Sequence, residues 1–406
     1  MFDASSRMLL RGAPDLPDLD PETLDELLTA AHIELATVRL VSEQVGDASD
    51  TDVFDRVRRL ASTLEAYVAL NLRPEQIRAA AFVAGTAHQI LFRLRARQPD
   101  QPTLVSSDAI GSAISATLLF LIADRVADAA EAAAQLRAKG ERRPIRRLLI
   151  LSVREFATGK LTALIDRDLD VDSVLRDDSR EHATDLLLRE CAHAIQDLAR
   201  EALSGPSSST DIHERLARVI MLSQASSAGS EFGLEGFHHQ FAGPHHLATL
   251  LSRLVDGVQA SMLVRLPAPF GADVDAWSEW IRTQARSRPF LWVNHLKAIG
   301  TGYLDRGQSM VMTSPTGSGK TTLSVLKIAA TLCAGESVIY LAPTHALVDQ
   351  VEADLSSQIG ELQPAISVED TALDELGERL PPFSVMTPER CLALLGFAPE
   401  LFSTVG

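Results

Sequence analysis

The sequence has few cysteines, few aromatic side chains and no long apolar run. Its three cysteines, Cys191, Cys333 and Cys391, show no CxxC spacing, which argues against a disulfide framework or a structural zinc site and indicates a reducing compartment. Aromatic residues make up only 5% of the chain, whereas alanine, leucine, aspartate and arginine are abundant. This composition favours helices over an all-β fold.

Basic residues are also in deficit, with 38 Lys and Arg against 54 Asp and Glu and a net charge of −16. This balance argues against a chain that coats nucleic acid or a membrane through bulk charge, although a local basic groove remains compatible with it. The most apolar stretch, residues 109–123, is shorter than the roughly 20 residues that span a bilayer. The first residues show no secretion signal. We therefore expect a soluble, cytoplasmic protein without a membrane partner.

Two regions of different texture divide the chain, and we place their boundary between residues 286 and 287. Asp20-Pro21 pairs a helix-capping residue with a proline at the first helical position, and apolar residues then recur at helical spacing. Similar amphipathic runs, separated by turn-forming residues, follow at 52–72, 75–97, 107–138, 143–158, 181–203, 211–226 and 244–265. Residues 1–286 are therefore predicted to form an irregular all-α domain.

From residue 287 onward, short apolar runs alternate with helical ones. The strand-like runs are 308–314, 337–342 and 382–387, and the helical runs are 320–334, 346–359 and 389–396. Strands that alternate with helices are typical of a parallel α/β sheet.

The segment SPTGSGKT, residues 314–321, lies between the first strand and the first helix of this region. Gly317 and Gly319 permit the torsions that turn several N–H groups toward one anion, and the following helix adds the positive end of its dipole. Lys320 can reach the β- and γ-phosphates of a nucleotide, and the Thr321 hydroxyl can ligate magnesium. We predict Lys320 and Thr321 as catalytic residues, with the nucleotide-binding set completed by Pro315, Thr316, Gly317, Ser318, Gly319 and Thr322.

Two threonines, Thr344 and Thr387, each lie near the end of a predicted strand, where they are expected to cap the following helix. Taken singly, either is explained as a cap, and Thr387-Pro388-Glu389 is a good helix start on structural grounds alone. Two such caps behind a phosphate loop favour helix N-termini that hold the phosphates of a nucleic-acid strand without reading its bases.

The order SPTGSGKT, APTHALVDQ and TPER resembles the first RecA-like domain of superfamily 2 helicases, which include the DEAD/DEAH-box and DExH proteins. For residues 287–406, which follow the predicted irregular all-α domain, the resemblance implies an incomplete RecA-like P-loop NTPase sheet. It also implies an ATP-dependent helicase or translocase with ATP and Mg²⁺ as cofactors and DNA or RNA as partner. The nucleic-acid backbone contacts that it implies are Pro343, Thr344, Thr387, Pro388 and Glu389.

Residues 291–299, LWVNHLKAI, are similar to the segment with which the family's motor domain begins. His295 takes the place of the glutamine that usually reads adenine, so the resemblance implies a nucleotide-binding role for it. An imidazole can stack on adenine or hydrogen-bond to it, but it cannot reproduce the amide's paired donor and acceptor.

The family pattern also has an Asp-Glu pair after TPER and a second RecA-like domain with an arginine finger, and neither is present in the 406 residues. Asp374-Glu375 precedes the TPER strand and is not a substitute. We therefore expect a fragment of a longer helicase that binds nucleotide weakly and does not hydrolyse it. A helical region ahead of such a motor is similar to some bacterial defence helicases, such as the Hachiman type.

Other interpretations stay open. The rival function is a nucleotide-gated scaffold whose helical domain binds a partner protein. The histidines at 238–239 and 245–246 fit either a metal site or a structural role. The basic run from Lys139 to Arg147 fits either contact with nucleic-acid phosphates or a solvated helix start.

Overall fold

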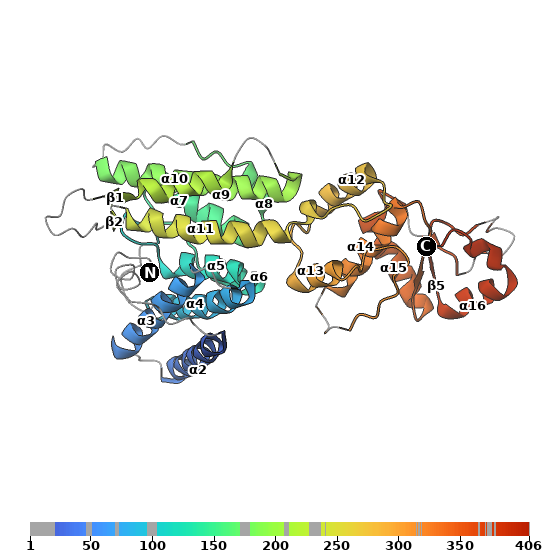
Figure 1. The fold of residues 1–406 in the computed structure, drawn as a ribbon, viewed down its shortest axis with the longest axis horizontal. Helices are drawn as coiled ribbons and strands as arrows, with labels where there is room; N and C mark the ends of the chain where they lie inside the picture. Colours follow the sequence, from blue (N-terminus) through green and yellow to red (C-terminus); the bar gives the residue numbers. More distant parts are fainter. Residues whose placement is uncertain are drawn as a thin grey trace. The chain divides into compact units, whose positions relative to one another are not determined.

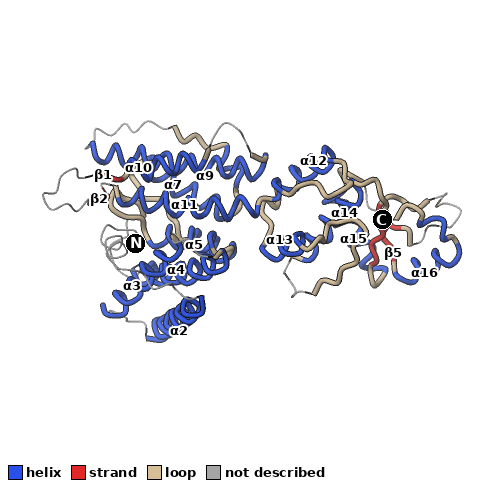
Figure 2. The backbone as a smooth tube through the Cα atoms, in the orientation of Figure 1, coloured by secondary structure: helices blue, strands red, loops and turns tan. Residues whose placement is uncertain are grey.

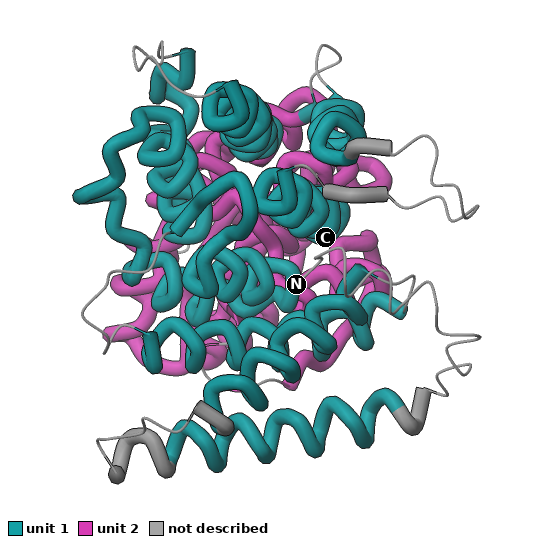
Figure 3. The backbone as a smooth tube through the Cα atoms, turned by 90° about the vertical axis from the view of Figure 1, so that its left-hand side faces the viewer, with its two compact units in different colours: residues 1–201, 206–260 teal, residues 202–205, 261–406 magenta. Residues whose placement is uncertain are grey.

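The computed structural model describes residues 21–45, 51–69, 73–95, 104–170, 179–206, 211–226, 237–239, 241–313, 315, 317, 319–363, 366–369, 371, 376 and 379–405. The chain divides into two compact units, coloured separately in Figure 3. The helical unit comprises residues 1–201 and 206–260, and the C-terminal unit comprises residues 202–205 and 261–406. No helix in the described ranges is both long and apolar enough to cross a membrane.

The helical unit is built almost entirely of helices (Figure 1). They are α2 (Pro21–Val45), α3 (Thr51–Val68), α4 (Pro74–Arg95), α5 (Ser112–Ile122), α6 (Val126–Ala134), α7 (Pro144–Ala157), α8 (Leu161–Ile165), α9 (Ser179–Ser204), α10 (Ile212–Leu222) and α11 (Ala242–Ser261). A short antiparallel pair, β1 (Gln224–Ser226) and β2 (Phe237–His239), departs from the expected all-α pattern.

The expected helical run 107–138 is two helices rather than one. Asp124 has φ 57, in the left-handed region that aspartate tolerates better than most residues, and this turn separates α5 from α6. Helix α5 is buried along nearly its whole length, and its Phe120 ring lies against the bare Cα of Gly85 in α4. The apolar stretch is thus a core helix of this unit, as its sequence predicts.

The C-terminal unit has a three-stranded parallel sheet in the order β3-β5-β4. Figure 2 draws strands in red and labels β5 in this unit. The strands are β3 (Val338–Leu341), β4 (Ile366–Ser367) and β5 (Phe383–Met386). The helices are η1 (Leu263–Arg265), α12 (Val274–Ala285), α13 (Val293–Gly300), α14 (Lys320–Cys333), α15 (His345–Ile359), α16 (Pro388–Phe397) and η3 (Pro399–Phe402). The predicted fold class, a helical region followed by part of a RecA-like parallel α/β sheet, is confirmed.

Both faces of β5 are covered. Phe383 and Val385 belong to one apolar core with residues of α12, α14 and α15, whereas Met386 belongs to a second core with Leu394 of α16 and Leu401 of η3. Alternate residues of a strand point to opposite faces, and burial on both faces is usual for parallel sheets. Helix α12 contributes Trp277 and Trp280 to the first core, so residues 261–286 pack with the C-terminal unit. The division at 286/287 as a functional boundary stays a prediction.

The expected strand at 308–314 is not observed, because residues 308–313 belong to no strand and Ser314 lies outside the described residues. The side chain of Val311 is 91% exposed. β5 is hydrogen-bonded on both sides, and the outer edge of β3 carries a single parallel bridge from Ser337 to Val405. An apolar run becomes a strand only where a neighbour offers its backbone, and this segment has no such neighbour in the described sheet.

Candidate functional site

The phosphate loop leads directly into α14. Gly317 and Gly319 have φ 79 and 81, and the helix begins at Lys320. Both torsions lie in the left-handed region that favours glycine, so the backbone turn expected from the sequence is formed. Thr316 and Ser318 lie outside the described residues, as does Ser314.

Lys320 folds back over this loop. Its Nζ donates a hydrogen bond to the carbonyl oxygen of Pro315 at 3.0 Å, while its side chain remains exposed. Thr321 is exposed beside it and Thr322 is half-buried. The ammonium group, a hydroxyl and the first N–H groups of α14 therefore lie together at one helix start, where the helix dipole favours an anion.

His295 packs against the same loop. Its ring is 3% exposed and stacks on Trp292, with centroids 5.3 Å apart and planes at 10°. Its Nδ1 accepts the backbone N–H of Trp292 at 3.2 Å, so the neutral ring carries its proton on Nε2. A Cβ at position 319 would overlap this ring and lie 2.7 Å from His295 Cε1. The structure thus brings together two parts of the predicted nucleotide site that are far apart in sequence.

The two predicted threonine caps differ. Thr387 is 3% exposed, and its Oγ1 accepts the backbone N–H of Arg390 at 3.2 Å, which caps α16. Thr344 occupies the corresponding position of α15, but its side chain forms no capping hydrogen bond and is exposed together with Pro343. The cap expected at Thr344 is therefore wrong as regards its side chain.

Glu369 is a residue that the sequence analysis missed. It follows β4, and its carboxylate accepts the N–H of Thr387 at 2.7 Å and the hydroxyl of Thr387 at 2.9 Å. It also pairs with Nδ1 of His345, the first residue of α15, at 3.3 Å. The carboxyl ends of all three strands thus meet at Glu369. Because β4 is only two residues long, the sequence gives little signal of a third strand end at this edge.

The N-termini of α15 and α16 differ in how accessible they are to a ligand. Thr387 uses both its N–H and its hydroxyl within the protein, and Pro388 has no N–H to donate. Glu389 is exposed and adds an acidic side chain to the first turn of α16. The start of α15 is the more accessible of the two, because Pro343 and Thr344 are exposed.

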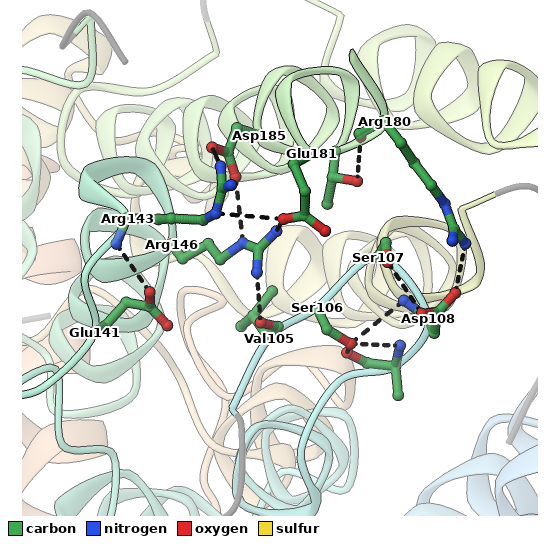
Figure 4. Close-up of polar contacts among 12 residues, drawn as sticks. Val105, Ser106, Ser107, Asp108, Glu141, Arg143, Arg146, Arg180, Glu181 and Asp185 are labelled. Carbon is green, nitrogen blue, oxygen red and sulfur yellow. Dashed lines mark hydrogen bonds and ion pairs between the residues drawn. The ribbon is translucent and has the colours of Figure 1, made fainter. Parts of the chain in front are cut away.

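The basic run of the helical unit is partly internal (Figure 4). Arg143 Nη1 bonds Asp185 Oδ2 at 2.7 Å, and Arg146 Nε bonds Asp185 Oδ1 at 3.2 Å. Both arginines also pair with Glu181, and Arg146 is only 7% exposed. These two arginines join the start of α7 to α9, so for them a solvated helix start is wrong. Exposed basic side chains of the run are Lys139, Arg142 and Arg147.

Of the histidine patch, His245 and His246 in α11 are also internal, and the side chains of residues 238–239 lie outside the described ones. His246 Nε2 bonds Glu65 Oε1, and His88 Nε2 bonds Glu65 Oε2 at 3.2 Å, which joins α3, α4 and α11 at one fully buried carboxylate. Burial raises the pKa of Glu65, but the attraction of His246 and His88 outweighs it and holds the pKa well below its ordinary value. Burial lowers the pKa of His246. No group of three or more His, Cys, Asp or Glu side chains in the described ranges is arranged to hold a metal ion.

Comparison with known protein families matches residues 294–405 to the DEAD/DEAH box helicase family. The matched segment contains the phosphate loop, α14 to α16 and all three strands of the sheet. The resemblance to this family is confirmed for these residues, and the DExH subtype stays a prediction. No curated protein matches the chain.

Proposed function

We propose that the DEAD/DEAH box helicase domain at residues 294–405 binds Mg²⁺-ATP and serves an ATP-dependent helicase or translocase that acts on DNA or RNA. The observation that carries this proposal is the pair of left-handed glycines, Gly317 and Gly319, that leads into α14 with Lys320 at its first position. This geometry presents backbone N–H groups, a helix dipole and one ammonium group to a single anion.

The residues present fit a magnesium-bound triphosphate. Lys320, which bonds the Pro315 carbonyl, would hold the β- and γ-phosphates, and backbone N–H groups around Gly319 would donate to phosphate oxygens. The Thr321 hydroxyl is an oxygen ligand of the kind that Mg²⁺ prefers. When bound, the ion neutralises charge that develops on the transferred phosphoryl group.

We place the nucleic-acid strand along the carboxyl edge of the sheet. Pro343 and Thr344 at the start of α15 are exposed there, and N–H groups in the first turn of a helix bind backbone phosphates without base specificity. Thr387 contributes indirectly in this arrangement, because Glu369 holds it, while Pro388 and Glu389 lie at the neighbouring helix start. Binding of phosphates by N–H groups at helix N-termini does not require a basic surface, so it is compatible with a net charge of −16.

Isothermal titration calorimetry of the full chain with ATP in excess Mg²⁺ tests the first step. We expect binding by the wild type and a loss of about a hundredfold in Lys320→Ala, because the principal charged contact with the phosphates is removed. Lys139→Ala, an exposed lysine of the helical unit, should bind like the wild type. Equal binding by Lys320→Ala, or no binding by the wild type, would contradict the proposal.

A further inference from the structure

We propose that His295 is a positioning residue for the phosphate loop, and that the site it supports selects the triphosphate rather than the base. The proposal rests on the function proposed above. It differs from the base-reading role implied by the position of His295 in the sequence, because here the ring faces the loop.

Three contacts hold the His295 imidazole between Trp292 and the phosphate loop. Its face stacks on Trp292, its Nδ1 accepts the Trp292 N–H, and its Cε1–Nε2 edge lies where a side chain of residue 319 would be. The same hydrogen bond fixes the ring at the start of α13, since Trp292 precedes the first helical residue. The His295 ring is therefore held in one position and packs against Gly319.

Two separate features require glycine at position 319. Its φ of 81 is strained for any side chain, and the His295 ring fills the space that a Cβ would need. Gly317 has almost the same torsion, φ 79, but a Cβ there would meet nothing within 4 Å. Comparison of the two glycines therefore separates the contact with His295 from the backbone strain.

The burial of the His295 ring limits its contact with the base of a nucleotide. With 3% of its surface exposed and both ring edges turned toward protein, it has no face on which an adenine could stack while it supports the loop. Binding energy then comes from contacts with phosphates, which every nucleoside triphosphate shares. The affinities for ATP and GTP should therefore differ by no more than about threefold. This difference is smaller than the one that a single well-placed polar contact to a base would produce.

The first test is calorimetric titration of the full chain with Mg²⁺ and three ligands: ATP, GTP and inorganic tripolyphosphate, which has no base. We expect His295→Ala to weaken all three by a common factor of about tenfold, because the loop loses its support. His295→Phe keeps a ring in the same space and should retain most of the affinity for all three. If His295→Ala fails to fold, comparison of the three affinities of His295→Phe still shows whether the residue acts on the base or on the shared phosphates.

The second test is a pair of double-mutant cycles. Gly319→Ala should weaken binding less in the His295→Ala background than in the wild type, with a coupling of about fivefold or more, because the overlap with the ring is gone. The matched cycle of Gly317→Ala with His295→Ala should be additive, since a Cβ at position 317 would meet no described residue within 4 Å, His295 included.

Each outcome decides a different point. A loss confined to ATP in His295→Ala or His295→Phe would assign adenine recognition to this residue and overturn the inference. Unchanged affinities in His295→Ala, or equal coupling in the two cycles, would overturn it as well. If the wild type binds none of the three ligands, it is the proposed function that fails.

Discussion

The helical unit buries polar side chains between its helices, whereas the C-terminal unit also presents polar side chains at exposed helix starts beside the phosphate loop and the sheet edge. In the helical unit, Glu65, Arg146 and Gln196 are buried, and each is bonded to groups on other helices or loops; Gln196, for example, donates to the carbonyl oxygens that end α8. In the C-terminal unit, Lys320 and Thr344 are exposed at helix starts.

This difference separates a packing role from a binding role. A buried polar group that is fully bonded favours one arrangement of helices, and it is costly to disturb. An exposed group beside a glycine-rich turn adds little to stability and remains available to a ligand. Substitutions of the two kinds of side chain should therefore affect different properties: unfolding for the buried, bonded groups and binding for the exposed ones.

The strongest test of this comparison is Glu65→Ala. It leaves His88 and His246 buried without their shared acceptor, and we expect a loss of about 4 kcal/mol in the free energy of unfolding. Urea denaturation followed by far-ultraviolet circular dichroism measures the change. Glu214→Ala, which removes an exposed pair with Arg218, should cost less than about 0.5 kcal/mol. Similar costs for the two variants would contradict the distinction.

Two glycines of α11 give the next largest effect. A Cβ on Gly243 would overlap the carbonyl oxygen of Ser106, so Gly243→Ala should destabilise the helical unit by about 3 kcal/mol. Gly257 lies exposed in the same helix with nothing within 4 Å of its Cβ position, and Gly257→Ala should stabilise the unit by about 0.5 kcal/mol. Calorimetric melting of both variants checks the opposite signs.

Acid should weaken the helical unit. The lowered pKa of His246 means that its imidazole takes up a proton below about pH 6.5 in the unfolded chain but only at a lower pH in the folded chain. The lowered pKa of Glu65 has the same sign below about pH 4.3. Stability should therefore fall as the pH falls through both ranges. Urea midpoints measured from about pH 7 to about pH 3 test this, and Glu65→Gln should remove the part of the fall that lies below about pH 4.3.

The smallest effect compares the two threonines at the sheet edge. Thr387→Val removes the cap of α16 and one bond to Glu369, and should destabilise the C-terminal unit by about 1.5 kcal/mol. Thr344→Val should change stability by less than about 0.5 kcal/mol, because its hydroxyl forms no capping bond. Equal losses in calorimetric melting would show that both helix starts are closed.

Local signals predict much of the fold. Pro21, Pro74 and Pro144 each stand at the first residue of a helix, where the sequence pattern also begins a helical run. The left-handed turn of the phosphate loop follows from Gly317 and Gly319 alone, because its geometry is a property of neighbouring residues.

The remainder depends on partners distant in sequence. Glu65 meets His246 across 181 positions, and Arg146 meets Asp185 across 39. Neither pairing leaves a periodic trace in the sequence, and the same is true of the contact between His295 and Gly319. The apolar run at 308–313 has a strand pattern but no partner strand in the described sheet. The pattern therefore predicts a strand that the tertiary structure does not form.

All three tryptophans of the chain lie in the C-terminal unit. Trp277 and Trp280 are buried in its core, whereas Trp292 is 42% exposed and stacked on His295. Intrinsic tryptophan fluorescence therefore observes this unit alone, and the helical unit contributes nothing to the emission. The unfolding of the C-terminal unit can thus be followed apart from that of the helical unit in the intact, unlabelled chain, and Trp292 provides an intrinsic fluorescent probe beside the phosphate loop.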